Sequence, residues 1–571
     1  MTGTLKQTTA LLATQAVIFV IFPIAARAAK LDLESATIPE IEAALDSHSI
    51  TSKELVQMDL NRIDAYDKQG PNINAIRDIN PNALQIAEDL DRERAATGPK
   101  GPLFGIPLLL KDNINTADEP TTAGSLALQG SIPPTDAFIT KQLRNEGAII
   151  LGKANMTEFA NYLTTGMPAG YSSLGGYVFN PYDPRPQPGG DGRPVLSPGG
   201  SSAGPAAAVA ANFVTVAIGT ETSGSILSPS NQNSLVGIKP TVGLVSRDGI
   251  IPIAASQDTA GPIAHNVTDA AILLGGVTGV DSKDPATSSS EGKLYTDYTQ
   301  FLKVDGLKGA RIGVPHDYYW DNLTPGQRTI TENAIAKMKS LGAEIIDADI
   351  PTARELANVN SSVLSYEFKR DLNAYLSTLG PNAPVKTLAD VIAFNNAHPE
   401  AALKYGQTLA LASEAKDLEL DKPKYLADRA TDLRLAKDEG LDFIINKYNL
   451  DAVLFPATNG AAIGAKAGYP SIIVPDGYLS DGSPYGVTFL GKAYSEPTLI
   501  SLAYSYEQAS QLRLPPTSTP PLSGDTVPVP EPTTTAAPTV LGLAAIGLKL
   551  LSRRQIRWRC KNYLRIEKSC S

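Results

Sequence analysis

Apolar residues follow two patterns along the chain. One is the helical spacing of amphipathic helices, and the other is the short continuous run of strands buried on both faces. Residues Thr51 to Glu54 form a capping box, and the run from Leu55 to Tyr66 repeats apolar residues at helical spacing. Short, wholly apolar runs predict strands buried on both faces. We expect such strands at Ile106 to Leu110, Ala148 to Leu151, Val214 to Ile218, Ala452 to Phe455 and Ser471 to Val474.

The pattern changes between about Asp281 and Leu441, where charged residues become more frequent and helical spacing dominates. Helices are predicted over Ile330 to Leu341, Leu403 to Ala415 and Lys424 to Tyr448, and they would suit a lid or cap over the sheet. No long linker, low-complexity run or internal repeat interrupts residues 31–514. The simplest interpretation is one large α/β domain.

The first 28 residues have the pattern of an export signal. Lys6 precedes an apolar run from Leu11 to Ile24, and Ala26-Arg27-Ala28 has the small-x-small form of a cleavage site. An uncleaved anchor helix is the alternative.

The other end of the chain has three parts. Residues 515–535 are rich in Pro, Thr and Ser and predict a linker, residues 536–554 form an apolar segment with a basic end, and residues 555–571 form a basic tail. The string Val529 to Pro532, the apolar segment and Arg553-Arg554 resemble the PEP-CTERM sorting tail of exported bacterial proteins. That resemblance implies recognition by a membrane sorting machinery, although about 17 residues follow the arginine pair here. A Pro-rich linker with a weak C-terminal anchor is the alternative.

Composition restricts the classes of function. Of the 571 residues, 42% are hydrophobic and 19% charged, which predicts a folded protein, and the net charge of −10 argues against nucleic acid as a partner. The export signal carries two positive charges and residues 533–571 a net seven, so residues 29–532 carry −19. The acidic part of the chain is therefore its predicted domain. No feature of the sequence indicates an oligomeric state.

Histidine and cysteine are scarce. The chain has four scattered histidines, and its two cysteines, Cys560 and Cys570, lie near the C-terminus. No ligand spacing typical of zinc is present, so we expect no metal and no cofactor. A hydrolase built from this chain must activate its nucleophile by means other than cysteine or histidine.

Lysine and serine supply the candidate chemistry. Lys111 closes an apolar strand, where desolvation lowers the pKa of a lysine, although a lone edge lysine more often reaches solvent. Two Gly/Ser-rich loops follow, one at Pro198 to Pro205 before an Ala-rich helix and one at Gly219 to Pro229 after a strand. Serine beside convergent backbone N–H groups suits a nucleophile with its oxyanion hole, and each loop alone is equally typical of a plain turn.

Together these segments resemble the amidase signature family, whose catalytic unit is Ser-Ser-Lys without histidine. The resemblance implies an amidase signature fold, a large twisted mixed β-sheet covered by helices in a single α/β domain. It extends through Gly101 to Ile114, Gly152 to Ala160, Asn180 to Tyr182, Val236 to Ser246, Ser256 to Pro262, Gly468 to Pro475 and the helix around Glu507.

The resemblance assigns roles by position. It implies that Ser225 is the acyl-forming nucleophile, Ser201 the bridging serine and Lys111 the base. It also implies a cis peptide bond at Gly200–Ser201 or Ser201–Ser202. The oxyanion would be held by the backbone amides of Thr222, Ser223, Gly224 and Ser225.

Three positions differ from the commonest form of the family's sequence motif, which has Asp, Gly and Arg where this chain has Glu221, Ser223 and Leu227. The wording is most similar to a peptide-amidase-like branch, which removes the C-terminal amide of peptides. An insert at residues 185–197 precedes the bridging serine and is either a flexible surface loop or part of the entrance.

The resemblance and the export signal together predict an exported amidohydrolase of the cell envelope or the extracellular space. It would cleave a carboxamide C–N bond in a small amide or a peptide amide, releasing ammonia or an amine. Two alternatives remain. A relative of the amidotransferase subunits that work on charged transfer RNA fits poorly with export, and a non-catalytic surface-binding relative fits poorly with intact Lys111, Ser201 and Ser225.

Overall fold

The structure is a computed structural model, and it describes residues 29–529. The predicted export signal (1–28), apolar segment (536–554) and basic tail (555–571) lie outside these residues. Contacts group Leu31–Val527 into one compact unit. Within residues 29–529, no helix has the length and apolar character that crossing a membrane requires.

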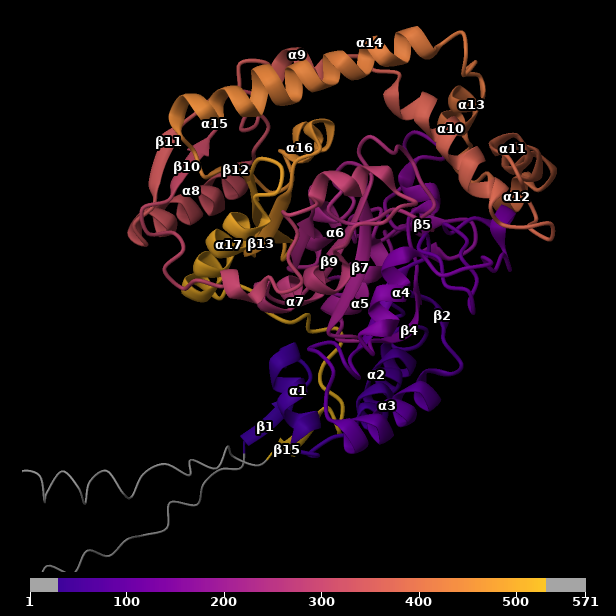
Figure 1. The fold of residues 1–571 in the computed structure, drawn as a ribbon, viewed down its shortest axis with the longest axis vertical. Coiled ribbons are helices and arrows are strands. Elements are labelled where there is room, and N and C mark those ends of the chain that lie inside the picture. Colours follow the sequence, from indigo (N-terminus) through magenta and orange to yellow (C-terminus); the bar gives the residue numbers. More distant parts are fainter. Residues whose placement is uncertain (1–28, 530–571) are drawn as a thin grey trace, which may run out of the picture. The chain divides into compact units, whose positions relative to one another are not determined.

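An eleven-stranded mixed β-sheet is the centre of the unit (Figure 1). Its strands lie in the order β11 (Glu344–Asp347), β10 (Arg311–Val314), β12 (Ala452–Pro456), β14 (Pro484–Leu490), β13 (Ser471–Tyr478), β8 (Val236–Lys239), β9 (Thr259–Ala264), β7 (Val216–Glu221), β3 (Pro107–Lys111), β4 (Ile149–Ala154) and β2 (Ile76–Ile79). Two small sheets pair β1 (Ala29–Asp32) with β15 (Thr526–Val529) and β5 (Tyr171–Ser172) with β6 (Gly176–Tyr177).

The five apolar runs predicted as strands all form strands of this sheet, which start within two residues of the predicted starts and extend up to four residues beyond the predicted ends. They correspond to β3, β4, β7, β12 and β13, in which nearly every residue is buried. Burial on both faces explains why these runs are wholly apolar instead of alternating. The predicted mixed α/β sheet is confirmed.

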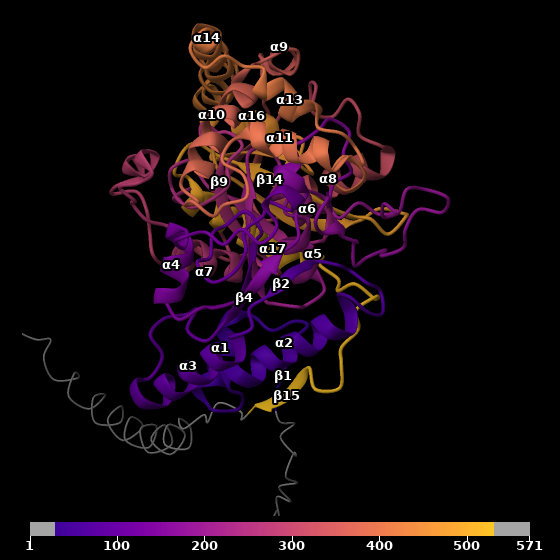
Figure 2. The ribbon, with the colours of Figure 1, turned by 90° about the vertical axis from the view of Figure 1, so that its right-hand side faces the viewer.

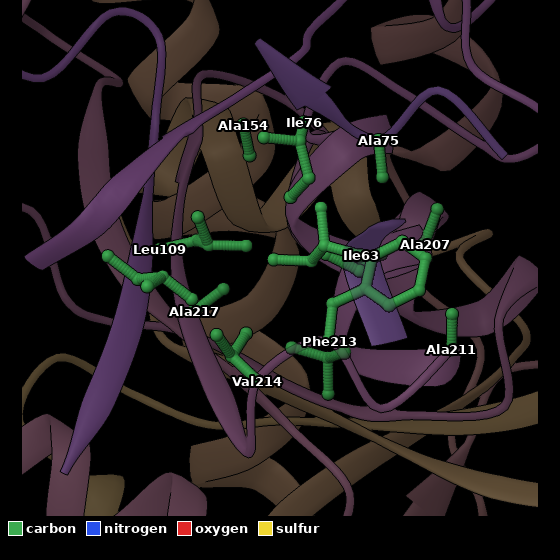
Figure 3. Close-up of a cluster of buried hydrophobic side chains, with 14 of the residues drawn as sticks. Ile63, Ala75, Ile76, Leu109, Ala154, Ala207, Ala211, Phe213, Val214 and Ala217 are labelled. Atoms are coloured by element: carbon green, nitrogen blue, oxygen red, sulfur yellow. The ribbon is translucent and has the colours of Figure 1, made fainter. Parts of the chain in front are cut away.

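Helices α2 (Ser52–Tyr66), α3 (Ala83–Thr97) and α5 (Ala203–Ala210) pack on β3, β4 and β7 through one apolar cluster (Figure 3). The predicted capping box starts α2, because the Thr51 side chain accepts from Glu54 N–H and the Glu54 carboxylate accepts from Thr51 N–H. Figure 2 shows α2 and α3 side by side, far from α10, α11 and α13.

Some of the remaining helices pack on the sheet and others pack on neighbouring helices. They are α1 (Ile38–Asp46), α4 (Phe138–Asn145), α6 (Leu227–Gln232), α7 (Val267–Val277), α8 (Pro325–Ser340), α9 (Ala353–Ala357), α10 (Val363–Ser377), α11 (Leu388–Ala397), α12 (Pro399–Ala402), α13 (Thr408–Glu414), α14 (Lys422–Leu433), α15 (Asp442–Tyr448), α16 (Ala461–Ala467) and α17 (Glu496–Ser510). A π-helical segment, Arg434–Leu441, joins α14 to α15 in one long helix along the top of Figure 1.

Part of residues 281–441, which were expected to suit a lid or cap over the sheet, belongs to the sheet itself. Strands β10 and β11, with α8 between them, lie in this region and extend the edge of the central sheet as a parallel pair. Each strand has four residues, and β11 is half exposed, so neither produces a long apolar run. Helices α10 to α14 do pack on one another, and of these the spacing predicted α13 and α14.

Candidate active site

Two neighbouring parallel strands bring the candidate lysine to the reacting loops. β3 and β7 pair in register, with Leu110 opposite Ile218, so their carboxyl ends lie at the same edge. Lys111 is the last residue of β3 and is fully buried. Its Nζ lies 2.8 Å from Ser201 Oγ, 2.9 Å from Thr220 Oγ1 and 3.1 Å from the Thr220 carbonyl oxygen. The structure thus joins Lys111 directly to one predicted serine.

The loop that carries Ser201 is held on both sides. Ser201 is fully buried, and its carbonyl accepts from Thr157 N–H at 3.1 Å. The adjacent Ser202 hydroxyl donates to the Thr220 carbonyl and accepts from Thr220 N–H. Gly204 in α5 allows this close approach, because a Cβ there would lie 2.1 Å from the Asn155 carbonyl. The peptide bond between Gly200 and Ser201 is cis, at the first of the two expected positions.

Ser225 lies in the turn between β7 and α6, and 7% of its surface is exposed. Its carbonyl accepts from Ser202 N–H at 3.2 Å, whereas its hydroxyl has no hydrogen bond to a described residue. The side chains of Ser201 and Ser225 therefore belong to neighbouring loops but are not hydrogen-bonded to each other here.

Four consecutive backbone N–H groups in this turn have no acceptor within residues 29–529: those of Thr222, Ser223, Gly224 and Ser225. The Glu221 carboxylate accepts from the next two, Ile226 N–H at 2.7 Å and Leu227 N–H at 3.0 Å. Gly224 has a φ of +84°, which favours glycine in this turn. Such a row of free donors is suited to a developing oxyanion.

Burial sets the protonation state of the lysine. Desolvation lowers the pKa of Lys111 to about 7, although the negative charges of Glu221 and Asp258 oppose this lowering. A lysine that is neutral in part of the population near pH 7 can accept a proton from a serine hydroxyl.

A cavity of about 590 Å³ opens beside Thr222. Helix α10 contributes Asp371, Ala374 and Tyr375 to its wall, followed by the C-cap residue Thr378, and these residues have the spacing of adjacent turns on one face. The charged residues of the wall include Arg247 and Asp284, which form an ion pair with each other. The cavity has room for a substrate larger than a simple amide.

Several residues at this site had no role in the sequence-based prediction. Thr220 contacts Lys111 through two atoms, and Asn113 Nδ2 donates to Thr220 Oγ1 at 3.0 Å. Asp258 accepts from the Thr222 hydroxyl at 2.6 Å, and desolvation raises the pKa of Asp258 to about 7. Residues 220 and 258 lie inside the motif segments, but a motif does not indicate which side chains meet.

The model of the amidase family matches residues 54–500. The chain belongs to the amidase family. A probable amidase of Arabidopsis thaliana is 41% identical over 494 residues, which cover 85% of this chain and 92% of that protein. The crystal structure of the peptide amidase of Stenotrophomonas maltophilia superposes with a TM-score of 0.79 and 43% identity, covering 84% of this chain and 98% of that one.

A more distant relative is one of the subunits of glutamyl-tRNA(Gln) amidotransferase in a Geobacter species. It is 32% identical over 510 residues, or 85% of this chain and 99% of that protein. Membership of the amidase family makes this chain an amide-hydrolysing enzyme with the amidase signature fold.

One of the positions that differ from the commonest amidase sequence lies in an apolar contact. Leu227, where the family commonly has arginine, is fully buried and packs with Ala461 and Ile473. The position is part of an apolar contact in this amidase. Within the described part of the chain, no group of three or more His, Cys, Asp or Glu side chains is arranged to hold a metal ion.

Proposed function

We propose that this amidase is exported and hydrolyses C-terminal peptide amides through a Ser201–Lys111 relay and an acyl-enzyme on Ser225. The observation that carries the proposal is the 2.8 Å contact between the Lys111 amine and Ser201 Oγ, made by a lysine whose pKa burial lowers to about 7.

In the first step, neutral Lys111 takes a proton from Ser201 Oγ, which takes one from Ser225 Oγ. That second transfer requires the two hydroxyls to meet in the substrate complex, since catalytic hydrogen bonds often tighten only there. Ser225 Oγ bonds to the carboxamide carbon, and the carbonyl π electrons move to oxygen. The four free N–H groups at positions 222–225 support an oxyanion at that place.

The same relay runs in reverse to release the amine. Lys111 returns its proton through Ser201 to the amide nitrogen, the C–N bond breaks, and ammonia leaves when the substrate is a primary amide. A water molecule then attacks the ester on Ser225, with Lys111 again accepting a proton through Ser201. The products are the free acid and the regenerated hydroxyl.

Two findings support peptide amides as the substrate class. The structure is similar to a peptide amidase over 98% of that protein's length, and the cavity beside Thr222, at about 590 Å³, can hold residues that precede an amidated C-terminus. Export is supported by the sequence of residues 1–28, and sorting at the membrane by the pattern from Val529 to Arg554.

Ammonia release from an amidated dipeptide by the full-length chain tests the proposal. Ser225→Ala should abolish the activity, whereas Ser228→Ala, three residues further on, should retain it, because Ser228 contributes no group to the relay. Mass spectrometry of the quenched reaction should find the acyl group on the peptide that contains Ser225. Undiminished ammonia release by the Ser225→Ala variant would contradict the relay.

The amidotransferase alternative has less support. The identity to the Geobacter protein is 32%, against 43% to the peptide amidase, and an exported enzyme does not meet charged transfer RNA. Recovery of the native protein from the cytoplasm with partner subunits would favour that alternative.

A further inference from the structure

Helix α10 holds a turn that lies outside the catalytic loops. The Glu367 carboxylate accepts from Ser256 N–H at 3.0 Å, and the Asp371 carboxylate accepts from Ala255 N–H at 2.9 Å. Glu367 is almost completely buried, and its other oxygen accepts from the Tyr425 hydroxyl of α14 at 2.6 Å. Two acids one turn apart on one helix thus fix two adjacent backbone amides, at residues 255 and 256.

The same turn holds the start of the oxyanion loop. Asp258 Oδ2 accepts from Ile253 N–H and Ala254 N–H, both at 2.9 Å, which closes the turn. Asp258 Oδ1 accepts from the Thr222 hydroxyl at 2.6 Å, and Gln257 Nε2 approaches the Thr222 carbonyl at 3.4 Å. Thr222 is therefore held from both its side chain and its backbone.

Helix α10 also reaches the substrate cavity and the loop after the catalytic lysine. Its Asp371, Ala374 and Tyr375 line the cavity, and the Tyr375 hydroxyl donates to Asn115 Oδ1 at 2.7 Å. One helix thus contacts the cavity beside Thr222, the loop after Lys111 and the turn 253–258.

We infer that Glu367 is a positioning residue for the oxyanion hole, which acts through the turn 253–258 on Thr222. This inference rests on the proposed acyl-enzyme at Ser225. The four free N–H groups begin at Thr222, so a shift of the turn moves the donors relative to the carbonyl oxygen that they stabilise. Small displacements of preorganised donors reduce transition-state binding more than ground-state binding.

The test compares Glu367→Ala and Glu367→Gln in the full-length enzyme. Alanine removes the acceptor for Ser256 N–H. We expect kcat to fall about tenfold, which is less than the loss that follows removal of an oxyanion donor, and KM to change by no more than about twofold. Glutamine retains an acceptor and should restore most of kcat. Ser365→Ala on the same helix should match the unchanged enzyme, because among the described residues the Ser365 hydroxyl donates only to the carbonyl of the N-cap residue Ser362.

Inhibitor binding separates positioning from a merely structural role. A peptide aldehyde adds to Ser225 to form a tetrahedral adduct that uses the oxyanion hole, whereas the corresponding peptide alcohol forms no adduct. Glu367→Ala should weaken the aldehyde about tenfold and leave the alcohol unchanged. If that variant does not fold, Glu367→Asp can replace it, because aspartate shortens the side chain by one methylene. Glu367→Asp should also weaken aldehyde binding and leave alcohol binding unchanged, with a smaller effect than alanine.

Two different failures are distinguishable. If the unchanged enzyme releases no ammonia from any amide, the proposed function fails. If it is active but the ratio of aldehyde to alcohol affinity is the same in the Glu367 variants, the inference about Glu367 is overturned.

Discussion

The hydrogen bonds of Lys111 discriminate between its two protonation states. Three acceptors surround Nζ, namely Ser201 Oγ and the two oxygens of Thr220. An ammonium would donate to all three, whereas a neutral amine has two N–H donors and one lone pair. With both N–H groups on Thr220, the lone pair faces the Ser201 hydroxyl. Deprotonation thus turns a lysine that only stabilises the site into one that accepts a proton.

This geometry predicts the acid side of the pH profile. Because burial lowers the pKa of Lys111 to about 7 and the proposed base is the neutral amine, kcat/KM should rise with pH through that region and level off above it. Below about pH 6 it should fall about tenfold per pH unit. A pH series of initial ammonia-release rates measures this dependence, and a flat profile from about pH 5 to about pH 8 would exclude Lys111 as the base.

Glu221→Gln should displace that profile. The negative charge of Glu221 raises the pKa of Lys111 against desolvation, so removing the charge lowers this pKa further and extends activity to lower pH. Glutamine retains an acceptor for Ile226 N–H and Leu227 N–H. The pKa of Asp258, also raised to about 7, lies in the same range, so the two groups titrate together. An unchanged or upward-shifted acid limb in Glu221→Gln would contradict the assignment of this limb to Lys111.

At the scale of elements, the insert at residues 185–197 is exposed at its start and is held to the rest of the chain near Asp191. Lys404 Nζ lies 4.7 Å from the ring centre of Tyr177, 5.4 Å from that of Tyr171 and 5.7 Å from that of Tyr405. It donates to the Asp191 carbonyl at 2.8 Å, and the Asp191 carboxylate accepts from the Tyr405 hydroxyl. The insert thereby connects the link between α12 and α13 to the segment that precedes Ser201.

Lys404→Met should loosen this connection. Loss of the cation from the three tyrosine rings should lower the free energy of unfolding by about 1 kcal/mol and expose the insert to cleavage by thermolysin before Leu196, because both arginines of the insert precede proline and resist trypsin. Lys404→Arg should preserve both properties, because a guanidinium also binds aromatic faces. Chemical denaturation and limited thermolysin digestion measure the two effects, and equal rates of cleavage before Leu196 in all three proteins would show that the insert is not held through Lys404.

The elements also show which features a sequence can predict. The strands that lead to Lys111 and Glu221 were predictable because burial on both faces makes residues 106–110 and 214–218 continuously apolar, and α2 because its capping box is local. Strands β10 and β11 were missed because each has only four residues and β11 is exposed or half-buried throughout. The contacts of Glu367 and Asp258 with the turn 253–258 and the oxyanion loop join segments that are 111 and 36 residues apart, and no periodicity encodes such pairings.

At the scale of the whole molecule, the segment after residue 514 is tied to the first helices. Arg62 of α2 is fully buried and pairs with Asp525, and it donates to the carbonyls of Ala211 and Thr519, both at 2.8 Å. Residues 515–527, which begin the predicted linker, belong to the compact unit. The guanidinium therefore joins α2, the end of α5 and the C-terminal segment in one polar contact.

Removal of one partner of this contact should be costly, because it leaves the other charge buried without compensation. Arg62→Ala should lower the free energy of unfolding by about 3–5 kcal/mol in urea denaturation. A chain ending at Leu514 should lose a comparable amount, whereas a chain ending at Val529 keeps Asp525 and should be as stable as the full-length protein. Because both changes break the same contact, Arg62→Ala should add much less to the chain ending at Leu514 than to the full-length protein. Fully additive losses would mean that Arg62 and the segment after residue 514 stabilise the amidase independently.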